Sequence, residues 1–528
     1  MVEKTDFYLN YYKDVLSLDE DDFIQFKTAV LKPLAYTFRI VRNAHFTRIT
    51  EFIKKNFFQI CQPIECVKDT YIFYKHNQIS NCSYDMDLYN QFTEFLISNT
   101  AVGNIQRQEI VSMIPVELLS IQKNHFVYEP CAAPGSKTKQ ILEKLNGTGL
   151  LVANDVSKSR VNILITESQK NNTLNLVITN DNAGSFPQSP MNKNFFDRIC
   201  CDVPCSGDGT VRKNISIFND WSVKRACQLI DLQIKILQRS LSTLKEGGIL
   251  TYSTCSLNPL ENEYVINRAL LNFPNCKIIL PQEAFNLVSY TKDKTKLMIR
   301  KGIPFFQYTI DSKRYEYNDC ELEKCIRIYP HDNDTGGFFI AIIQKQPMET
   351  EEKRPIWAGI AKMHKSVENY VPRTEIDDRF ITNNSLLHYI FMKPSHKKIF
   401  VVNNNVYKYL MSNPDMHLIM TGIKGYEKTT TIGGNNNLMY MPNNKFLNII
   451  DFSENIICID IDNLLKFSQE EVIEKKKISN LDIQSIAGYH IVSVKDLNYK
   501  FMIYCNNNKI ISFMKKTFRQ IITQLYSK

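Results

Sequence analysis

Two cysteine-bearing segments of this sequence have the residue types of a reaction centre. Gly248–Ser256 is an apolar run that ends in hydroxyl-bearing residues and presents Cys255 near its tip. Cys201–Gly207 follows a second apolar run and carries Asp202 and Cys205. A thiolate is a strong nucleophile, and a carboxylate can orient a base or hold a proton. A cysteine taken singly is more often a packing residue, so the pairing of the two segments is what favours chemistry.

The elements expected around these segments put both cysteines at one edge of a sheet. From about residue 121, short apolar runs alternate with helix-length amphipathic stretches, which is typical of a parallel sheet covered by helices. Strands are predicted over 125–129, 150–153, 174–178, 197–202, 249–254 and 336–343, and helices over 138–145, 157–170, 221–245 and 261–271. We interpret Gly247 and Gly248 as the end of the helix that precedes the Cys255 strand. Open parallel sheets bind ligands at the carboxyl ends of their strands, where both cysteines are expected.

Pro130–Thr138, after the first predicted strand, is a turn of small residues that leads into a helix. It lacks the first glycine of a phosphate-binding P-loop and the spacing of a dinucleotide fingerprint. Its small side chains allow the backbone to lie against a ligand. Asp155 ends the next strand, where it can accept hydrogen bonds from ribose hydroxyls, and Asp181 ends the third, where it can receive an adenine amino group. With Lys137 near the charged end, the pattern predicts a nucleoside-cofactor site of the S-adenosylmethionine type, although any one carboxylate could instead cap a helix.

The composition narrows the class of protein. The 528 residues include 64 Lys and Arg against 55 Asp and Glu, a formal charge of +9 that suits a polyanionic partner. Fourteen cysteines occur without a C-x-x-C pair, which disfavours a zinc finger or ribbon. The first residues lack the apolar core of a signal peptide, and no run of about 18 apolar residues occurs. We therefore expect free thiols in a reducing intracellular compartment and no membrane partner.

The length predicts about three domains. We expect an N-terminal RNA-binding-like α/β domain over 1–120, a catalytic domain over 121–345, a linker over 346–355 and a C-terminal region over 356–528. The linker is charged, holds two prolines and lacks an apolar period, and the C-terminal region has short strand-like segments typical of an α+β domain. In the N-terminal domain, Arg39 and Arg42 could contact a nucleic-acid backbone or equally form a solvated face.

Several strings around these residues resemble, in the correct order, the Nop/Sun family of RNA cytosine-5 methyltransferases. They are Pro130–Thr138, Asn154-Asp155, Asn180–Ala183, Asp202–Thr210, Arg212–Asn214, Tyr252–Pro259, Pro330-His331 and Thr335–Phe339. Asn104–Pro115 and Thr421–Lys424 are similar to the eukaryotic tRNA-modifying branch, the multisite tRNA methyltransferases. There are two departures: Glu129 stands where the family usually has aspartate, and Ile299–Phe305 only loosely follows its Arg-x-x-Met-Phe-Pro-Pro segment.

The resemblance implies a fold, a cofactor and a set of site residues. The fold is α/β, a Rossmann-like S-adenosylmethionine-dependent methyltransferase sheet with a small N-terminal α/β domain and a C-terminal PUA-like α+β domain that contacts RNA. The catalytic residues implied are Cys255 as nucleophile, Cys205 in product release, and Asp202. The residues implied to bind S-adenosylmethionine are Cys131, Ala132, Ala133, Pro134, Gly135, Ser136, Lys137, Asp155, Arg160, Asp181 and Asp202. The implied partner is tRNA, with other structured RNA as a second substrate class. We expect a monomer without a metal, located in the nucleus by resemblance, with the cytoplasm as the alternative.

The implied chemistry explains these residue types. Carbon 5 of cytosine is a poor nucleophile, so a thiolate first adds to carbon 6 and makes carbon 5 enamine-like, able to attack the sulfonium methyl. Asp202 can hold or protonate N3 of a base that has left its stack. Loss of the carbon 5 proton then releases the thiol. A free thiol has a pKa of about 8.5, so we expect basic neighbours such as Lys137 to lower it. The spacing alone leaves open which cysteine attacks, and a catalytically idle RNA-binding or RNA-folding protein is the alternative function.

Overall fold

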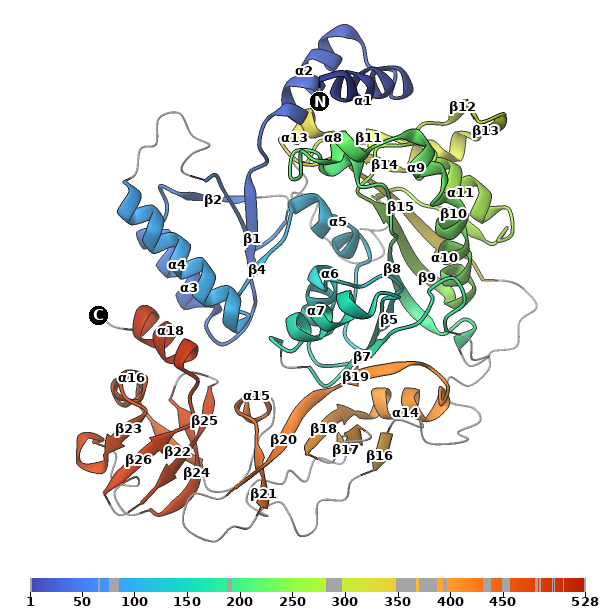
Figure 1. Cartoon of the computed structure of the whole chain (residues 1–528). Coiled ribbons are helices and arrows are strands. Elements are labelled where there is room, and N and C mark those ends of the chain that lie inside the picture. The colour runs from blue at the N-terminus through green and yellow to red at the C-terminus, as the bar shows by residue number, and fades with distance from the viewer. Residues whose placement is uncertain are drawn as a thin grey trace.

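The computed structural model describes most of the chain. It describes residues 2–64, 67–75, 85–171, 173–187, 192–281, 297–347, 367–369, 387–392, 397–430, 438–448, 456–479, 483, 486–495, 497, 499–506 and 508–526. From residue 348 onward, the expected linker lies outside the described residues. The described strands form sheets of ten, five, five, four and two strands (Figure 1).

The ten-stranded sheet is the centre of the molecule. Its path is β11 (Arg300–Lys301), β14 (Ile326–Ile328), β15 (Phe338–Lys345), β9 (Leu244–Thr254), β8 (Phe196–Asp202), β5 (Phe126–Glu129), β6 (Leu150–Asn154), β7 (Leu176–Thr179) and β19 (Leu418–Thr421), and β10 (Cys276–Ile278) pairs with β15. The run from β9 to β7 is parallel. β15 and β19 add to its two sides in antiparallel orientation. All six predicted strands are present, so the predicted α/β class is confirmed.

Helices cover both faces of this sheet (Figure 1). One face packs against α5 (Ile110–Leu118), α6 (Ser136–Leu145) and α7 (Lys158–Ser168). The other packs against α8 (Ile217–Asp220), α9 (Val223–Cys227), α10 (Ile230–Thr243) and α11 (Glu263–Leu270). A hairpin of β12 (Phe305–Ile310) and β13 (Lys313–Asn318) and the short helix α13 (Pro330–Asn333) complete this part. No helix in the described residues is both long and apolar enough to cross a membrane.

The predicted helix over 221–245 differs from the structure at two points. The regular helix is interrupted between α9 and α10, but Gln228 and Leu229 keep helical dihedral angles, so the apolar face continues. The helix then ends at Thr243, and β9 begins directly at Leu244. The interpretation of the two glycines at 247 and 248 as a helix end was therefore wrong. They lie inside β9, where the pairing with β8 shifts register and a residue with positive φ (Gly247, 74°) absorbs the extra length.

The N-terminal residues form two separate structures. A hairpin of α1 (Val2–Val15) and α2 (Glu20–Leu31) packs its tyrosines into the core of the large sheet's helical face. A small α/β domain follows, with the sheet order β2 (Cys61–Ile64), β3 (Thr70–Phe73), β1 (Tyr36–Ile40) and β4 (Ile105–Arg107), covered by α3 (Phe46–Asn56) and α4 (Met86–Val102). Figure 1 shows α1 and α2 beside the catalytic sheet rather than beside α3 and α4.

The C-terminal region is α+β, as expected. One sheet contains β16 (Val367–Asn369), β17 (Leu387–Met392), β18 (Lys398–Asn403), β20 (Ile423–Thr430) and β21 (Leu438–Pro442), next to α14 (Asn404–Ser412) and α15 (Asn444–Leu447). The other contains β22 (Ile456–Ile459), β24 (Gly488–Val494), β25 (Lys500–Cys505), β26 (Lys509–Ser512) and β23 (Val472–Glu474), with α16 (Ile461–Gln469) and α18 (Lys516–Tyr526).

The C-terminal region is joined to both other parts of the molecule. Its strand β19 extends the catalytic sheet, and Tyr409 of α14 packs against Phe195 and Phe196. At the other end, α18 packs against the N-terminal domain, where His45 Nδ1 lies 3.2 Å from the Tyr526 hydroxyl. The C-terminal region therefore contacts both the catalytic sheet and the N-terminal domain (Figure 1).

Candidate active site

Both predicted cysteines lie at the carboxyl ends of adjacent parallel strands. β8 and β9 pair with Asp202 opposite Ser253, and the chain beyond each strand brings Cys205 Sγ and Cys255 Sγ to 3.4 Å. Both are free, partly buried thiols. The hydrogen bond with Cys255 and then burial raise the pKa of the Cys205 thiol well above its ordinary value. Cys205 therefore keeps its proton at neutral pH.

Gly209 explains how the two cysteine loops approach so closely. Its amide donates to the Cys255 carbonyl (2.9 Å), and its own carbonyl accepts from the amide of Gly337 (2.8 Å). A Cβ at Gly209 would lie 2.4 Å from the Gly337 carbonyl oxygen and 2.9 Å from that of Cys255. Three strings far apart in the sequence therefore meet at a position that admits only glycine.

Asp202 is fixed by hydrogen bonds from the first turn of α6 and from the neighbouring strand β9. Lys137 Nζ donates to its Oδ2 (2.7 Å), and the Ser253 hydroxyl donates to its Oδ1 (2.7 Å). Burial alone would lower the pKa of Lys137, but the Asp202 carboxylate raises it overall, so the lysine is charged. The neighbouring Glu129 is neutral at pH 7, because burial raises its pKa to about 8. The hydrogen-bonding partner of Lys137 is thus Asp202 rather than either thiol, unlike the neighbour expected from the sequence.

The turn from Cys131 to Gly135, directly before α6, is held by Asp155 and Arg160. The Asp155 carboxylate accepts hydrogen bonds from the amides of Ala133 (3.2 Å) and Ser157 (2.9 Å). Arg160 lies 3.4 Å from Asp155 and donates to the Ala133 carbonyl. Gly135 has a φ of 107°, and a Cβ there would lie 2.8 Å from Leu164 of α7. Asp155 is only 2% exposed, so it supports the turn in addition to any ligand it binds.

Asp181, after β7, lies next to the C-terminal region. Its Oδ2 accepts a hydrogen bond from the amide of His417 (3.0 Å), directly before β19. The side chain remains partly exposed. Of the predicted residues, Asp155 and Asp181 follow β6 and β7, whereas Asp202 ends β8 on the other side of β5.

Asn154 is a site residue whose role the sequence did not indicate. Its side chain is fully buried, donates to the carbonyls of Pro130 (3.0 Å) and Asp181 (2.9 Å), and accepts from the Asp181 amide (2.9 Å) and the Thr179 hydroxyl (2.8 Å). It therefore links the ends of three strands. The sequence did contain one signal for Asn154: it stands next to Asp155 in the Asn154-Asp155 string that resembles the family.

Comparisons with known proteins identify the family. Residues 116–344 match a family model described as 16S rRNA methyltransferase RsmB/F. The chain is 32% identical over 326 residues to the tRNA (cytosine(49)-C(5))-methyltransferase of Pyrococcus abyssi, which covers 62% of this chain and 93% of that relative. The chain belongs to the RsmB/F (Nop/Sun) family. The resemblance inferred from the sequence strings is confirmed.

The similarity extends to longer eukaryotic relatives. The chain is 34% identical over 392 residues to the multisite-specific tRNA:(cytosine-C(5))-methyltransferase of Saccharomyces cerevisiae, which covers 66% of this chain and 57% of the relative. Its matches to relatives from Schizosaccharomyces pombe and Drosophila melanogaster cover 44% and 42% of those proteins, so the chain spans about half the length of these three. A solved structure of a methyltransferase homologue from Pyrococcus horikoshii aligns over 61% of this chain and 90% of that one, with 26% identity and a TM-score of 0.46.

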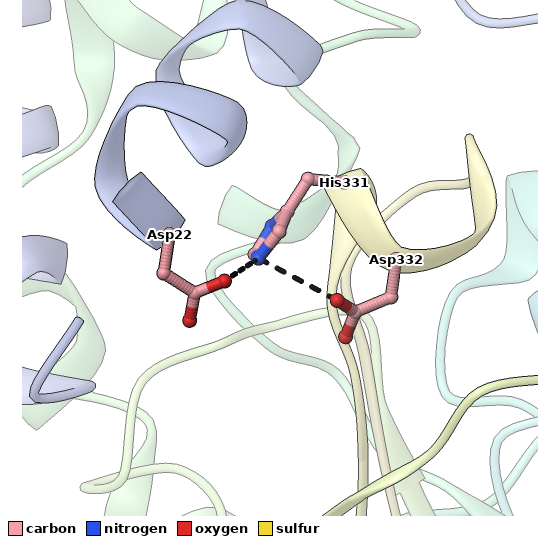
Figure 2. A group of neighbouring side chains, drawn as sticks. All are labelled: Asp22, His331 and Asp332. Carbon is pink, nitrogen blue, oxygen red and sulfur yellow. Dashed lines mark hydrogen bonds and ion pairs between the residues drawn. The ribbon is translucent and has the colours of Figure 1, made fainter. Parts of the chain in front are cut away.

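One cluster in this RsmB/F family member has the composition of a metal site. Asp22 of α2 and His331 and Asp332 of α13 converge, as Figure 2 shows. Arg300, from the divergent 299–305 segment, occupies the same space: it pairs with both carboxylates and lies 2.9 Å from His331 Nε2. A metal ion would have to displace this guanidinium. We interpret the cluster as a link between the N-terminal hairpin and the catalytic domain.

The Arg300→Gln variant should be less stable than the wild type by about 2–3 kcal/mol, because two partly buried carboxylates lose their charged partner. The hydrogen bond from Arg300, more than any other contact, lowers the pKa of Asp22. The stabilisation should therefore be present at neutral pH and disappear as the pH falls through that lowered pKa. Thermal unfolding across pH measures this.

Lys301→Gln is the matched control for this prediction. It removes the adjacent ion pair with Glu323, whose side chains are 78% and 42% exposed, and should cost less than about 1 kcal/mol. A melting temperature that rises when Zn²⁺ or Mn²⁺ is added to the wild type would instead indicate a metal site.

Proposed function

We propose that the chain transfers a methyl group from S-adenosylmethionine to carbon 5 of cytosine in tRNA. The observation that carries this proposal is the 3.4 Å contact between Cys205 Sγ and Cys255 Sγ beside the Asp202 carboxylate. An RNA-binding protein has no chemical need for two adjoining thiols at strand ends. The names of the relatives from S. cerevisiae and P. abyssi, both tRNA cytosine-C5 methyltransferases, support the substrate class.

In this mechanism Cys255 is the nucleophile. Its thiolate adds to carbon 6 of the unstacked cytosine, which gives carbon 5 its nucleophilic character. Asp202, fixed by Lys137 and Ser253, accepts a hydrogen bond from a proton carried on N3 of the ring, and that proton neutralises the negative charge that the thiolate brings to the ring. The assignment of Cys255 follows from the resemblance of Tyr252–Pro259 to the Nop/Sun family, in which the Thr-Cys residue is the nucleophile.

Cys205 acts in the second half of the reaction. Its pKa is raised first of all by the hydrogen bond with Cys255. Once Cys255 Sγ is bonded to carbon 6, that contribution is weakened, and Cys205 loses its proton to the solvent more readily. The Cys205 thiolate can then take up the carbon 5 proton, after which the bond between carbon 6 and Cys255 breaks and the methylated base leaves.

The residues at the strand ends fit the cofactor. S-adenosylmethionine supplies, when bound, an electrophilic methyl on a sulfonium. It also carries ribose hydroxyls and amino groups, which are donors, and Asp155, Asp181 and Asp202 offer acceptors along one edge of the sheet. The turn from Ala132 to Gly135 adds a backbone without long side chains. Asp155 and Arg160 hold this turn in place.

Asp155→Ala should weaken binding of S-adenosylhomocysteine about ten- to a hundredfold, the cost of a lost charge-assisted hydrogen bond. Isothermal titration calorimetry measures this. Because Asp155 also binds the amides of Ala133 and Ser157, Asp155→Asn is the matched variant: it retains an acceptor for the backbone and should bind more tightly than the alanine variant. Unchanged affinity in a folded Asp155→Ala protein would remove Asp155 from the cofactor site.

The test of the function is incorporation of labelled methyl groups into tRNA, followed by bisulfite sequencing to locate 5-methylcytosine. The alternative, a catalytically idle RNA-binding protein, predicts tRNA binding without incorporation and without affinity for the cofactor.

RNA contact is proposed for a cavity of about 940 Å³ between the three parts of the chain. It lies at the carboxyl-terminal end of α6, and thus at the opposite edge of the sheet from the cysteines. Its lining includes four cationic residues against two carboxylates, together with several aromatic rings: Arg42, Lys170, Lys428, Lys515, Glu143, Glu427, Tyr489, Tyr499, Phe513 and Phe518. Cationic and aromatic side chains together suit phosphates and exposed bases.

Lys515→Glu should lower tRNA affinity and reduce the slope of log affinity against log salt by about one to two, because a phosphate contact is lost and a like charge introduced. Filter binding over a salt series measures this. The control is Lys476, an exposed residue in the short helical turn directly after β23. Lys476→Glu should change tRNA affinity less than Lys515→Glu does. Equal effects of the two substitutions would show a diffuse charge effect rather than a contact in the cavity.

A further inference from the structure

A buried pair of carboxylates lies directly beneath the two cysteine loops. Asp208 and Glu261 have no measurable exposure. Ser206, which follows Cys205, places its Oγ 3.0 Å from Asp208 Oδ2 and 2.5 Å from Glu261 Oε2. Ser256, which follows Cys255, places its Oγ 3.0 Å from Asp208 Oδ2 and 2.9 Å from Glu261 Oε2. The residue after each cysteine is therefore held by the same two carboxylates.

The contacts between these four side chains require a proton beyond those of the serines. Two hydroxyls provide two hydrogens for four short oxygen–oxygen contacts. Burial raises the pKa of both carboxyls, and for Glu261 the next cause is the charge of Asp208. One carboxyl of the pair can therefore remain protonated and donate to a serine, so that three of the four contacts in this hydrogen-bond cycle hold a hydrogen.

Other donors fix the two carboxylates from outside the cycle. Asp208 accepts from the Leu257 amide (2.7 Å), the Trp221 indole (3.3 Å) and the Tyr12 hydroxyl of α1. Glu261 accepts from the Ser206 amide (2.8 Å) and the Gln233 amide group (3.1 Å). The first helix of the chain thus contributes a hydrogen bond to this network.

We propose that Asp208 and Glu261 are positioning residues that hold Cys205 and Cys255 in register through the serine that follows each of them. Tyr12 of α1 completes the arrangement. A rigid separation of the two thiols is needed because one must approach carbon 6 and the other carbon 5 of the same ring. This catalytic consequence rests on the proposed function, whereas the positioning itself does not.

The test measures the thiol pair without methylation. Diamide takes up the two hydrogens of neighbouring thiols as they join in a disulfide, and mass spectrometry of the Cys205–Cys255 peptide follows the rate. Glu261→Ala should slow this reaction about tenfold, the scale of one lost hydrogen bond to a charged group. Glu261→Gln should restore it largely, since the amide group can both accept and donate in the cycle.

Glu263→Gln is the matched control. Glu263 is an equally buried carboxylate two residues further on, but its partner is Arg327 rather than the serines. It should lower the melting temperature while the disulfide rate stays at the wild-type value. If Glu261→Ala fails to fold, the double variant Ser206→Ala with Ser256→Ala tests the proposal in its place. Disulfide formation should slow in it by the same factor. Tyr12→Phe should slow the reaction about threefold, the smaller effect of one neutral hydrogen bond.

A disulfide rate in Glu261→Ala or the double serine variant that equals that of Glu263→Gln would overturn the proposal. If the rates change as expected but the wild type makes no 5-methylcytosine, the positioning role stands and the proposed function fails. If wild-type methylation is present, the slower variants should also lose kcat with little change in KM for tRNA.

Discussion

Cys205→Ala should accumulate a covalent complex with tRNA that survives a denaturing gel, whereas Cys255→Ala should form none. In the first variant Cys255 can still add to carbon 6, but the base that removes the carbon 5 proton is missing, so the adduct resolves slowly. In the second variant carbon 5 is never activated. Methyl transfer should then fall on the order of 10⁴-fold or more, the scale of removing a nucleophile.

The experiment is a gel shift after incubation of each variant with cofactor and tRNA. Cys320→Ala, a substitution of an exposed cysteine outside the site, should behave as the wild type. A trapped band from Cys255→Ala and none from Cys205→Ala would mean that the two roles are reversed. Loss of stability without trapping in either variant would mean that both cysteines only pack.

Asp202→Asn should reduce methyl transfer about 10²- to 10³-fold, the usual loss when one group that stabilises transition-state charge is removed. The carboxylate is the partner of the buried Lys137 ammonium (2.7 Å), so the variant also leaves a charge unpaired. Asp202 is 30% exposed at its side chain, so we expect a stability loss of about 2–3 kcal/mol, below that of a fully buried pair.

The pH dependence of stability distinguishes the structural role of the Lys137–Asp202 ion pair from the catalytic role of Asp202. The pKa of Lys137 is raised overall in the folded protein, so its stabilisation is present at neutral pH and is lost only as the pH rises through the raised value. The loss of stability at alkaline pH that comes from Lys137 should therefore differ between Asp202→Asn and the wild type. Asp197→Asn is the matched control, because Asp197 pairs with Lys245 at the other end of the same strand and should affect stability but not kcat. An Asp202→Asn enzyme with wild-type kcat would exclude a role for this carboxylate at the base.

The sequence indicated the large sheet well because the signals for it are local. Apolar runs of strand length and amphipathic runs of helix length depend on neighbouring residues, so β5, β6, β7, β8 and β15 were each predicted close to their observed bounds. β9 begins five residues before its predicted start. The helix over 221–245 was less accurate at its end. Its apolar period ran into the first residue of β9, and a periodic pattern does not distinguish the last helical turn from an apolar strand start.

The packing of the first helix could not be derived in the same way. Tyr12 bonds to Asp208, which lies 196 residues away in the chain, and no local pattern links the two. The same holds for β19, whose pairing with β7 depends on residues from separate regions. A boundary drawn from composition at 346–355 does not reveal that a later strand completes the catalytic sheet.

The sequence by itself determined the chemical groups of the site: two thiols, one carboxylate at a strand end, and a small-residue turn before a helix. It also determined that parallel strands would bring those ends to one edge, because strand direction follows from the alternation of strands and helices. Only the tertiary structure decided the distances between the groups. The 3.4 Å between the thiols, the pairing of Lys137 with Asp202, and the buried Asp208–Glu261 pair all depend on contacts between loops. Such contacts are set by the packing of the whole chain rather than by any one segment.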